Sequence, residues 1–309
     1  MKLATWALLT LSIFSLAGKW LWSAELASHF KLQYFFLALG LFTFYLGTRS
    51  FKYIALSLIT LSINAYDIVP LFARKEFPAV SGKTQNLTIV QFNRYIDNLQ
   101  DNKVIQWLSN KKNKFDIVLI QEINPSFVQE LKSLVQIYPY QYITPQRGNF
   151  GQVLLSKKEI VGDIPKTSSD KPSFYLTAKI RLSETESLTF YGIHIMPPKT
   201  PTMAINRNSQ LNIIGQSISN DTSKIKIAVG DFNITPYSYF FSRFKEKVGL
   251  KNTMAGFGPQ NSWPSVSPID ILRIPIDHIF VSKNMQVLER RVGPNLGSDH
   301  FPIIVKLSL

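Results

Sequence analysis

Three apolar stretches at the amino terminus constrain the fold of this chain more than any other feature. They cover residues 3–22, 32–47 and 53–72, and the first and third reach the roughly 20 apolar residues that a helix needs to span a bilayer. The second stretch is shorter but rich in Phe and Leu. Trp and Tyr residues lie near the segment ends, as interfacial aromatic residues do. We therefore expect residues 1–73 to form a membrane domain of three transmembrane helices.

Two other interpretations of this segment stay open. A hydrophobic helical domain that remains in water could have the same composition. The apolar run after Lys2, with small residues up to Ala17, also resembles a cleavable signal peptide. An uncleaved helix is favoured because the apolar run continues through Trp22.

The short basic loop at residues 48–52 predicts the orientation of the chain, because positively charged loops tend to stay in the cytoplasm. The amino terminus would then be cytoplasmic, and everything after residue 73 would be extracytoplasmic. A cleaved signal peptide would leave the large domain on the same side. Arg74 and Lys75, just beyond the third stretch, oppose this orientation. We expect a multi-pass protein of the cell (inner) membrane.

The net charge of +14 is shared by both parts of the chain. Residues 1–85 contain eight Lys/Arg and three Asp/Glu, and the remainder contains 26 and 17, a surplus of nine positive charges. A positive field attracts phosphates, nucleic acid or acidic lipid headgroups without choosing among them, and a merely soluble basic surface is equally compatible. The chain has no Cys, which excludes disulfide bonds and thiolate metal sites.

Residues 74–86 are polar and lack periodicity, so we expect a linker there and a second domain at 87–309. Short β-rich runs predict strands at 87–92, 116–120, 152–155, 174–182, 188–193, 225–229, 276–281 and 303–307. Amphipathic runs predict helices at 101–113, 125–137, 203–218 and 237–248. Mixed strands and helices of this kind indicate an α/β fold in which two packed sheets carry helices on their outer faces.

The apolar run at 225–229 ends in Gly230, Asp231, Phe232 and Asn233. In extended geometry the side chains of Asp231 and Asn233 point to the same side. A carboxylate and an amide aimed at one spot suit an activated water and a phosphate oxygen. An Asx turn after a strand would use the same residues, so this motif alone leaves both interpretations open.

Polar residues also flank other expected strands, at Asn93, Glu122, His194, Asp277 and the pair Asp299-His300. Each one alone could be a strand-end hydrogen bonder, a turn cap or a buried structural histidine. Acids and amides supply hard oxygen ligands that suit Mg²⁺ or Mn²⁺. Histidines can act as acid, base or phosphate-binding cation. Their joint occurrence at strand ends indicates a functional site at a sheet edge.

In chain order these residues resemble motifs of the endonuclease/exonuclease/phosphatase superfamily, which includes DNase I, AP endonucleases, neutral sphingomyelinases and inositol polyphosphate 5-phosphatases. The motifs are Phe92-Asn93, Gln121-Glu122, His194, Gly-Asp-Phe-Asn at 230–233, Ile-Asp-His-Ile-Phe at 276–280 and Gly-Ser-Asp-His-Phe-Pro at 297–302. The resemblance covers about residues 87–309. It implies a four-layered α/β sandwich, with two packed mixed sheets flanked by helices, and metal-dependent cleavage of a phosphoester.

The resemblance also implies a Mg²⁺ site, with Mn²⁺ as an alternative metal. Glu122 would bind the metal, with Asn93 beside it and Asp299 as a further candidate ligand. Tyr95 stands where AP endonucleases have an Asp, and His194 is similar to the DNase I and sphingomyelinase branches. A role in the repair of abasic DNA sites is therefore not expected.

The resemblance assigns catalytic roles to the remaining motif residues. Asp231 would activate or orient the attacking water, and Asn233 would hold the scissile phosphate. His300, oriented by Asp277, would stabilise the charge that develops on phosphate together with His194. This division of labour is physically reasonable, because in-line attack on phosphorus needs positioning and charge neutralisation more than covalent help.

Three apolar segments before such a domain are similar to membrane-bound bacterial members of the superfamily that include the VanJ-type teicoplanin-resistance proteins. Arg207, near Gln210, and Trp263 are also similar to patterns in that group, so both are candidate substrate contacts, although Trp263 could equally be a packing residue. We expect a membrane-anchored, Mg²⁺-dependent phosphoesterase that acts near the bilayer on a lipid-linked phosphate or phospholipid. A metal-dependent nuclease on the outer face and a non-catalytic membrane scaffold are the alternatives. No partner protein is implied.

Overall fold

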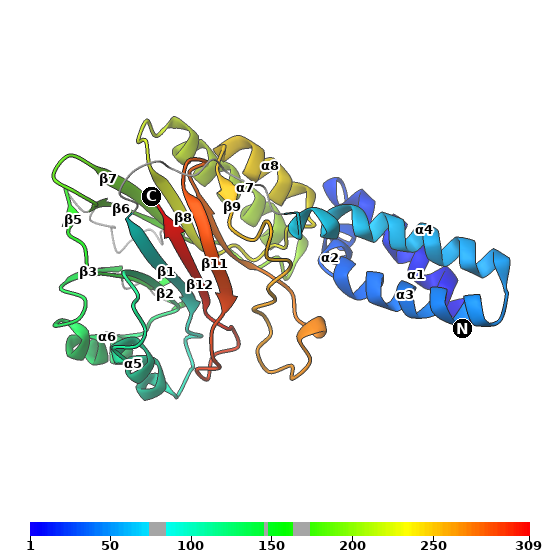
Figure 1. Cartoon of the computed structure of the whole chain (residues 1–309), viewed down its shortest axis with the longest axis horizontal. Helices are drawn as coiled ribbons and strands as arrows, with labels where there is room; N and C mark the ends of the chain where they lie inside the picture. The colour runs from blue at the N-terminus through cyan, green and yellow to red at the C-terminus, as the bar shows by residue number, and fades with distance from the viewer. Residues whose placement is uncertain (74–84, 145–147, 163–173) are drawn as a thin grey trace.

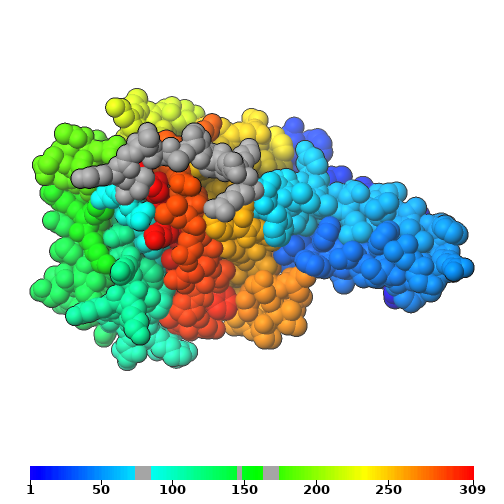
Figure 2. Space-filling model, viewed as in Figure 1, coloured from blue at the N-terminus to red at the C-terminus, as the bar shows by residue number. Residues whose placement is uncertain are grey.

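The amino-terminal helices form an arm that projects from the rest of the molecule (Figures 1 and 2). The structure is a computed structural model that describes residues 1–73, 85–144, 148–162 and 174–309. The elements of the arm are α1 (Lys2–Phe14), η1 (Ser15–Lys19), α2 (Trp22–Ser28), α3 (Lys31–Gly47), α4 (Phe51–Ile68) and η2 (Val69–Leu71). The amino terminus and the α3–α4 connection lie at the far end of the arm, and α2 lies at the end that meets the second domain (Figure 1).

The three transmembrane helices expected from the sequence are not confirmed. By length and apolar composition, Phe51–Leu71 is the one continuous helix among the described residues that could cross a bilayer. Lys2–Lys19 meets the same requirement only together with Trp22–Ser28, from which it is bent by 120°. The shorter helix α3 has 17 residues.

Gly18 explains why the first apolar stretch does not continue as one straight helix. An ideal Cβ atom at Gly18 would lie 3.1 Å from the Cα atom of Glu25, so the absence of a side chain lets α2 fold back against the end of η1. The side chain of Glu25 is buried in this fold. The expected span at residues 3–22 therefore ends near Lys19, because its continuation turns toward the second domain.

The second domain contains two six-stranded mixed sheets. One sheet has the order β11-β12-β1-β2-β4-β3 and the other β5-β6-β7-β8-β10-β9. Among the described strands, the pairs β1–β2 and β7–β8 are parallel and the remaining pairs are antiparallel. The strands are β1 (Asn86–Asn93), β2 (Ile117–Gln121), β3 (Tyr140–Thr144), β4 (Gln152–Ser156), β5 (Ile160–Val161), β6 (Tyr175–Arg181), β7 (Ser187–His194), β8 (Lys226–Asp231), β9 (Lys251–Asn252), β10 (Asp277–Val281), β11 (Gln286–Val292) and β12 (Ile303–Ser308).

Helices cover the outer face of each sheet. The helices are α5 (Asp101–Ser109), α6 (Pro125–Glu130), α7 (Pro201–Asn220) and α8 (Tyr239–Val248), with short 3₁₀ turns η3 (Leu131–Leu134), η4 (Gly148–Phe150) and η5 (Asp270–Leu272). One buried cluster joins α5 and α6 to the first sheet, a second joins α7 and α8 to the second sheet, and a third fills the space between the sheets. The expected α/β arrangement of two mixed sheets flanked by helices is confirmed.

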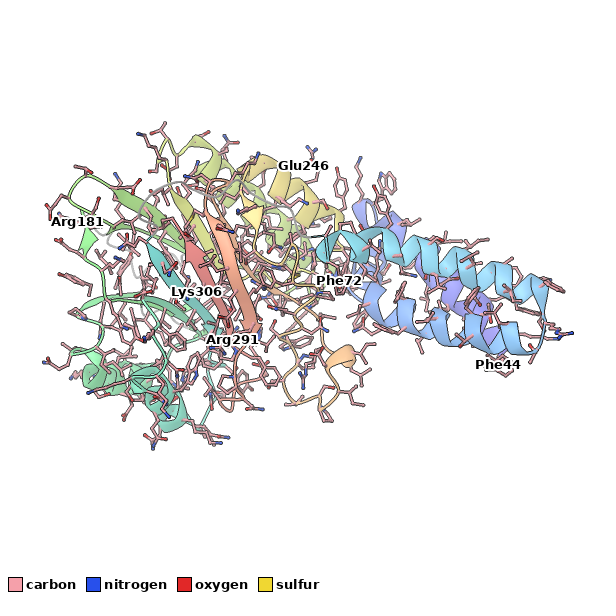
Figure 3. All side chains as sticks on the ribbon, in the orientation of Figure 1. Phe44, Phe72, Arg181, Glu246, Arg291 and Lys306 are labelled. Atoms are coloured by element: carbon pink, nitrogen blue, oxygen red, sulfur yellow. The ribbon has the colours of Figure 1, made fainter. Side chains whose placement is uncertain are left out.

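Four strands, β3, β5, β9 and β11, were not expected from the sequence. All four are edge strands, β3 and β11 of the first sheet and β5 and β9 of the second, and edge strands bury less apolar surface and carry more charge than central ones. In β11, Glu289, Arg290 and Arg291 interrupt the apolar pattern. In the β11–β12 ladder Glu289 pairs with Lys306 and Arg291 pairs with Ile304; Arg291 and Lys306 are labelled on these two strands in Figure 3. Of the linker expected at residues 74–86, residues 74–84 lie outside the described part of the chain.

Candidate active site

The polar residues at the strand ends come together at one edge of the two sheets. The parallel strands β1 and β2 bring Asn93 beside Gln121, the residue before Glu122. The parallel strands β7 and β8 bring His194 beside Asp231. Because the carboxyl ends of parallel neighbours meet at the same edge, each sheet delivers an acid and a second polar group. The side chain of Asn93 connects the sheets by donating hydrogen bonds to Glu122 Oε1 at 3.0 Å and to Asp231 Oδ2 at 3.1 Å.

Gly230 allows β7 and β8 to approach closely just before the site. Its φ is +153°, a conformation that side-chain-bearing residues rarely adopt. An ideal Cβ atom there would overlap the carbonyl oxygen of Ile193 and lie 2.7 Å from its carbonyl carbon. The glycine therefore sets the spacing between His194 and Asp231, the residues that follow this pair.

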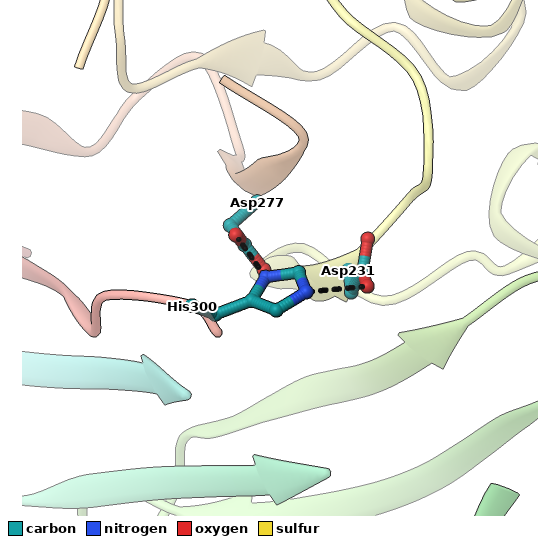
Figure 4. Close-up of side chains that lie close together, drawn as sticks. All are labelled: Asp231, Asp277 and His300. Atoms are coloured by element: carbon teal, nitrogen blue, oxygen red, sulfur yellow. Dashed lines mark hydrogen bonds and ion pairs between the residues drawn. The ribbon is translucent and has the colours of Figure 1, made fainter. Parts of the chain in front are cut away.

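His300 lies between two carboxylates (Figure 4). Its Nδ1 is 2.9 Å from Asp277 Oδ2, and its Nε2 is 3.7 Å from Asp231 Oδ2. Asp277 is the first residue of β10 and pairs with Asp231 across the antiparallel β8–β10 ladder. All three side chains are buried. The sheet register and the loop before β12 thus produce an acid–imidazole–acid arrangement.

The electrostatics of this arrangement favour a protonated His300. Burial alone would disfavour the imidazolium, but the charges of Asp277 and Asp231, together with the hydrogen bond to Asp277, raise the pKa of His300 to about 10. Burial also disfavours the charged form of Asp277 and would by itself raise its pKa. The charge of His300 and its hydrogen bond nevertheless hold the pKa of this carboxyl below its ordinary value.

Asp231 has the opposite shift. Burial raises the pKa of Asp231 to about 7, with the charge of Asp277 adding to the effect and that of His300 opposing it. A carboxylate that titrates near neutral pH can accept a proton from a water molecule. Asp231 is therefore suited to the role of general base.

His194 lies beside both Glu122 and Asp231. Its Nε2 lies 3.7 Å from Glu122 Oε1 and 4.0 Å from Asp231 Oδ2. Burial lowers the pKa of His194 to about 4, and the charge of His300 adds to this effect. His194 is therefore neutral at ordinary pH and can donate one hydrogen bond to a substrate oxygen.

The donors around Glu122 fit a hard divalent cation. Glu122 Oε1 accepts from the Asn93 side chain, and Oε2 accepts from the backbone N–H of Ile96 at 3.1 Å. Burial raises the pKa of Glu122, and the charge of Asp299 contributes to this shift. The amide oxygen of Asn93 accepts from the Tyr95 N–H at 3.0 Å, and its Nδ2 faces Glu122. Two carboxylates that oppose each other's ionisation, with this side chain beside them, supply the hard oxygen ligands that Mg²⁺ prefers. Glu122, Asn93 and Asp299 are therefore the residues that could hold the metal.

A second group of candidate metal ligands overlaps the acid–imidazole–acid arrangement. Asp231, Asp277 and His300 offer ligand atoms that all lie within 4.8 Å of one another. However, both acids lie close to the imidazole and favour its protonated form, and a protonated histidine cannot coordinate a metal. The Glu122 side of the site is the better match for a cation.

Asn233 has an unusual backbone conformation directly beside Asp231. Its φ is +47°, in the left-handed region. Its backbone N–H donates to Asp231 Oδ1 at 2.8 Å, and its side-chain Nδ2 donates to the carbonyl oxygen of Ile195 at 2.8 Å. A non-glycine residue in this region is strained and is kept there by its surroundings. The hydrogen bond from the Asn233 N–H to Asp231 Oδ1 closes an Asx turn, so the pair does not have the extended geometry considered from the sequence. The role of Asn233 in holding a phosphate stays a prediction.

Asp299 and Trp263 are neighbours at the rim of the site. The indole Nε1 of Trp263 donates to Asp299 Oδ2 at 3.1 Å, and its ring lies 6.5 Å from the ring of His300, centroid to centroid. Asp299 Oδ1 lies 4.0 Å from His300 Nε2, and the side chain of Asp299 is 35 % exposed. The predicted role of Trp263 as a substrate contact stays a prediction, and the structure adds a hydrogen bond to a candidate metal ligand.

Arg207 is fully buried near the start of α7. Its guanidinium donates to Glu25 Oε1 of α2 and to the carbonyl oxygen of Asn233, the latter at 3.1 Å, and its Nε donates to Asn208 Oδ1 at 2.7 Å. With these donors engaged and no exposed surface, Arg207 has the position of a residue that supports the Asn233 loop. The expected direct contact with substrate has no support in this geometry.

Three further residues of the site had no predicted role, although Gln121 lies in one of the motifs. Gln91 Nε2 donates to Asp277 Oδ1 at 2.7 Å, and Gln121 Oε1 accepts from the Asp231 backbone N–H at 2.8 Å. Both glutamines are fully buried in otherwise apolar strands. A polar residue within or at the end of an apolar run was the sequence signal that could have identified them. The third residue, Glu25, had a weaker signal, as one of two acids in the first 72 residues.

Comparison with known proteins agrees with this geometry. Residues 90–300 match the model of the family described as "Endonuclease/Exonuclease/phosphatase family". Among curated proteins, no sequence is significantly similar to this chain.

Solved structures share the fold at low sequence identity. TDP2 of D. rerio, in complex with a single-strand DNA product, is 20% identical with a TM-score of 0.57, and the match covers 72% of this chain and 99% of that one. An endonuclease/exonuclease/phosphatase from Bacteroides vulgatus is 17% identical with a TM-score of 0.57, covering 73% and 99%. Beta toxin from Staphylococcus aureus is 16% identical with a TM-score of 0.51, covering 71% and 99%. The similarity to a membrane-bound, VanJ-type branch stays a prediction.

Proposed function

This chain belongs to the endonuclease/exonuclease/phosphatase family, and on that premise we propose that it is a membrane-anchored hydrolase that cleaves a phosphoester near a bilayer surface. The observation that carries the proposal is the acid–imidazole–acid arrangement of Asp231, His300 and Asp277 beside the Glu122–Asn93 pair. Members of this family generally hydrolyse phosphoester bonds, and a non-catalytic scaffold would not need this buried set of charges.

Each residue of the arrangement has a role in the proposed reaction. Asp231 accepts a proton from the attacking water, because its pKa is near neutral. His300, kept protonated by Asp277, donates a charged hydrogen bond to the phosphate as negative charge develops. Asn233 and His194 flank Asp231 and orient the phosphate.

We assign the metal to Glu122, Asn93 and Asp299. When bound, Mg²⁺ or Mn²⁺ would neutralise charge on the phosphate as a Lewis acid. Asn93 Nδ2 donates to Glu122 Oε1 at 3.0 Å, and the Tyr95 N–H donates to Asn93 Oδ1 at 3.0 Å, so the oxygen atoms of both side chains are positioned before a cation arrives.

The surface of the arm supports a location in the bilayer. Inside the arm, polar groups bind each other: Thr5 Oγ1 lies 3.1 Å from Tyr45 Oη, and Asn64 Nδ2 donates to Ser12 Oγ at 2.9 Å. Large apolar side chains point outward, among them Leu3, Leu11, Ile13, Leu16, Phe36, Leu37, Phe44, Leu46, Leu58 and Ile59; Phe44 is labelled near the far end of the arm in Figure 3. A helical bundle in water would have the reverse pattern, whereas helices in lipid pack through small and polar residues.

The dimensions and charges of the arm favour a multi-pass anchor. The helix Phe51–Leu71 has 21 residues and is therefore roughly 31 Å long, close to the thickness of the hydrocarbon core. We propose that Lys2–Lys19, α3 and Phe51–Leu71 all cross the bilayer. Lys2 and Lys52 lie over aromatic rings at the end of the arm that is distant from the second domain. By the positive-inside rule this end would be cytoplasmic and residues 87–309 extracytoplasmic.

The leading substrate class is a lipid-linked phosphate or a phospholipid, because a short anchor confines the site to phosphates near the membrane. The second candidate is a metal-dependent nuclease on the outer face. It is favoured by the surplus of nine positive charges after residue 85 and by the single-strand DNA product bound to the similar D. rerio structure.

Full-length protein in phospholipid nanodiscs with Mg²⁺ tests the proposal. The probes are a polyprenyl phosphate, the nanodisc phospholipids and single- and double-stranded DNA, with Asp231→Asn as the inactive control. We expect turnover of a lipid probe that is lost in the variant. DNA cleavage without lipid turnover would select the nuclease instead, and its DNA affinity should then weaken with added salt. No turnover of any probe would refute the hydrolase, and full activity of the variant would show that Asp231 has another role.

A further inference from the structure

Helix α2 belongs to the arm in sequence but lies against the loops of the candidate active site. Trp22 Nε1 donates to the carbonyl oxygen of Pro198 at 2.9 Å, in the loop that follows His194. His29 Nδ1 lies 2.9 Å from Thr235 Oγ1, in the loop that follows Asn233. Two different loops that leave the site are therefore held by one seven-residue helix and its end.

Gln33, in the first turn of α3, extends this contact to a third loop. Its side-chain Nε2 donates to the carbonyl oxygens of Ile271 at 2.7 Å and Arg273 at 3.0 Å. The segment that contains these carbonyls also pairs with Trp263 through Ile274. The junction between arm and domain is thus formed by specific hydrogen bonds.

The centre of this junction is a buried ion pair. Glu25 is 1% exposed and Arg207 is 0% exposed. Glu25 Oε1 accepts from Arg207 and also from Ser238 Oγ at 2.9 Å. Removing one partner of such a pair leaves the other charge buried without compensation, which is strongly unfavourable. The position of α2 and the position of Arg207 therefore depend on each other.

Arg207 transmits this dependence to the site. Its guanidinium donates to the carbonyl oxygen of Asn233, whose φ is +47° and whose N–H donates to Asp231 Oδ1. A strained residue keeps its conformation only while its neighbours hold it. A continuous series of contacts thus runs from Glu25 through Arg207 and Asn233 to Asp231.

We infer that Glu25 and Arg207 are positioning residues for the hydrolysis proposed above. The membrane arm thereby helps to hold the Asn233 loop, and with it Asp231, in the geometry that the reaction needs. The inference rests on the proposed function for its kinetic consequence, but the contacts can be tested without any turnover. Without Glu25, Arg207 loses its charged partner, and the Asn233 loop loses the support that keeps it beside Asp231.

The test compares two charge-removing variants of the full-length protein in nanodiscs. Glu25→Gln breaks the buried pair that supports the Asn233 loop. Asp67→Asn breaks the other ion pair of the arm, between Lys31 of α3 and Asp67 of α4, and serves as the matched control. Hydrogen–deuterium exchange of residues 231–235 is the first readout. We expect at least about tenfold faster exchange at residues 231–235 in Glu25→Gln and little change there in Asp67→Asn, because only the first variant removes a partner of Arg207. Tyr237 is left out of the comparison because it packs against Ile68, the neighbour of Asp67.

Steady-state kinetics with a small water-soluble phosphodiester is the second readout. Misplacement of a reacting group by about 1 Å costs on the order of 100-fold in rate, so kcat of Glu25→Gln should fall by about 10- to 100-fold while KM changes by less than about threefold. The double variant Glu25→Gln/Arg207→Gln, which leaves no unpaired charge, should lose less than the product of the two single losses.

The outcomes separate this inference from the proposed function. Unchanged exchange at residues 231–235 in Glu25→Gln, or a kcat equal to that of Asp67→Asn, would overturn the positioning role. Faster exchange in Glu25→Gln with no phosphodiesterase activity in the wild-type protein would support the contact series and refute only the hydrolase assignment.

Discussion

Replacement of Gly230 by Ala should separate β7 from β8 and disable the site. The new Cβ atom would overlap the carbonyl oxygen of Ile193 and lie 2.7 Å from its carbonyl carbon and 3.0 Å from its nitrogen. Carbon atoms in contact lie about 3.5–4.0 Å apart, and the new Cβ atom would lie only 1.7 Å from the carbonyl oxygen, so the two strands must move apart by at least about 1 Å. The next pair along these strands is His194 and Asp231, and a shift of about 1 Å at reacting groups lowers kcat on the order of 100-fold.

The same change should lower stability. A φ of +153° is unfavourable for Ala, which costs about 1–3 kcal/mol, and the overlap adds a further term of about 1–3 kcal/mol. A total of about 3 kcal/mol corresponds to a fall in Tm of about 6–12 °C for a domain of this size. Tm followed by intrinsic fluorescence, together with kcat for a phosphodiester, measures both effects.

Gly249→Ala is the matched control for this prediction. Gly249 also has a positive φ, +65°, but an added Cβ atom would meet nothing within 4 Å. This variant should lose only about 1–2 kcal/mol for the left-handed conformation and keep the wild-type kcat. If Gly230→Ala matched Gly249→Ala in both Tm and kcat, the reasoning about the close approach of β7 and β8 would be refuted.

Three further predictions concern single side chains. Asp277→Asn removes the charge 2.9 Å from His300 Nδ1, so kcat should fall about 100- to 1000-fold; an unchanged kcat in steady-state assays would exclude the imidazolium role. Glu122→Gln should raise the Mg²⁺ concentration for half-maximal turnover at least about tenfold, and a titration that superimposes on wild type would place the metal elsewhere. Burial lowers the pKa of His278 to about 3, so its stabilising contribution is complete above about pH 6.5 and is lost as pH falls toward 3, by about 2 kcal/mol between pH 7 and 5. His278→Gln should therefore show a smaller loss of Tm than wild type over this range, and equal losses would contradict the assignment.

Local sequence patterns determined most of the elements and the members of the site. Apolar runs predicted eight strands, and these are the central strands of the two sheets. The reason is that a strand buried on both faces needs continuous apolar residues. The polar residues that interrupt or end these runs identified Asp231, His194 and Glu122, because an acid or imidazole at a buried strand end needs a partner. The edge strands β3, β5, β9 and β11 were not predicted, because their burial is decided by which neighbours they meet.

Partner choice was decided only by the tertiary structure. Glu25 and Arg207 are 182 residues apart in the chain, and no local pattern indicates that an acid among apolar helices pairs with an arginine of the second domain. For the same reason Arg207 was predicted to contact substrate, whereas its donors hold Glu25 and Asn233. A local pattern determines which side chains are polar and which face of an element they occupy. Long-range packing decides which charges become buried together, and thereby brings the amino-terminal arm to the candidate active site.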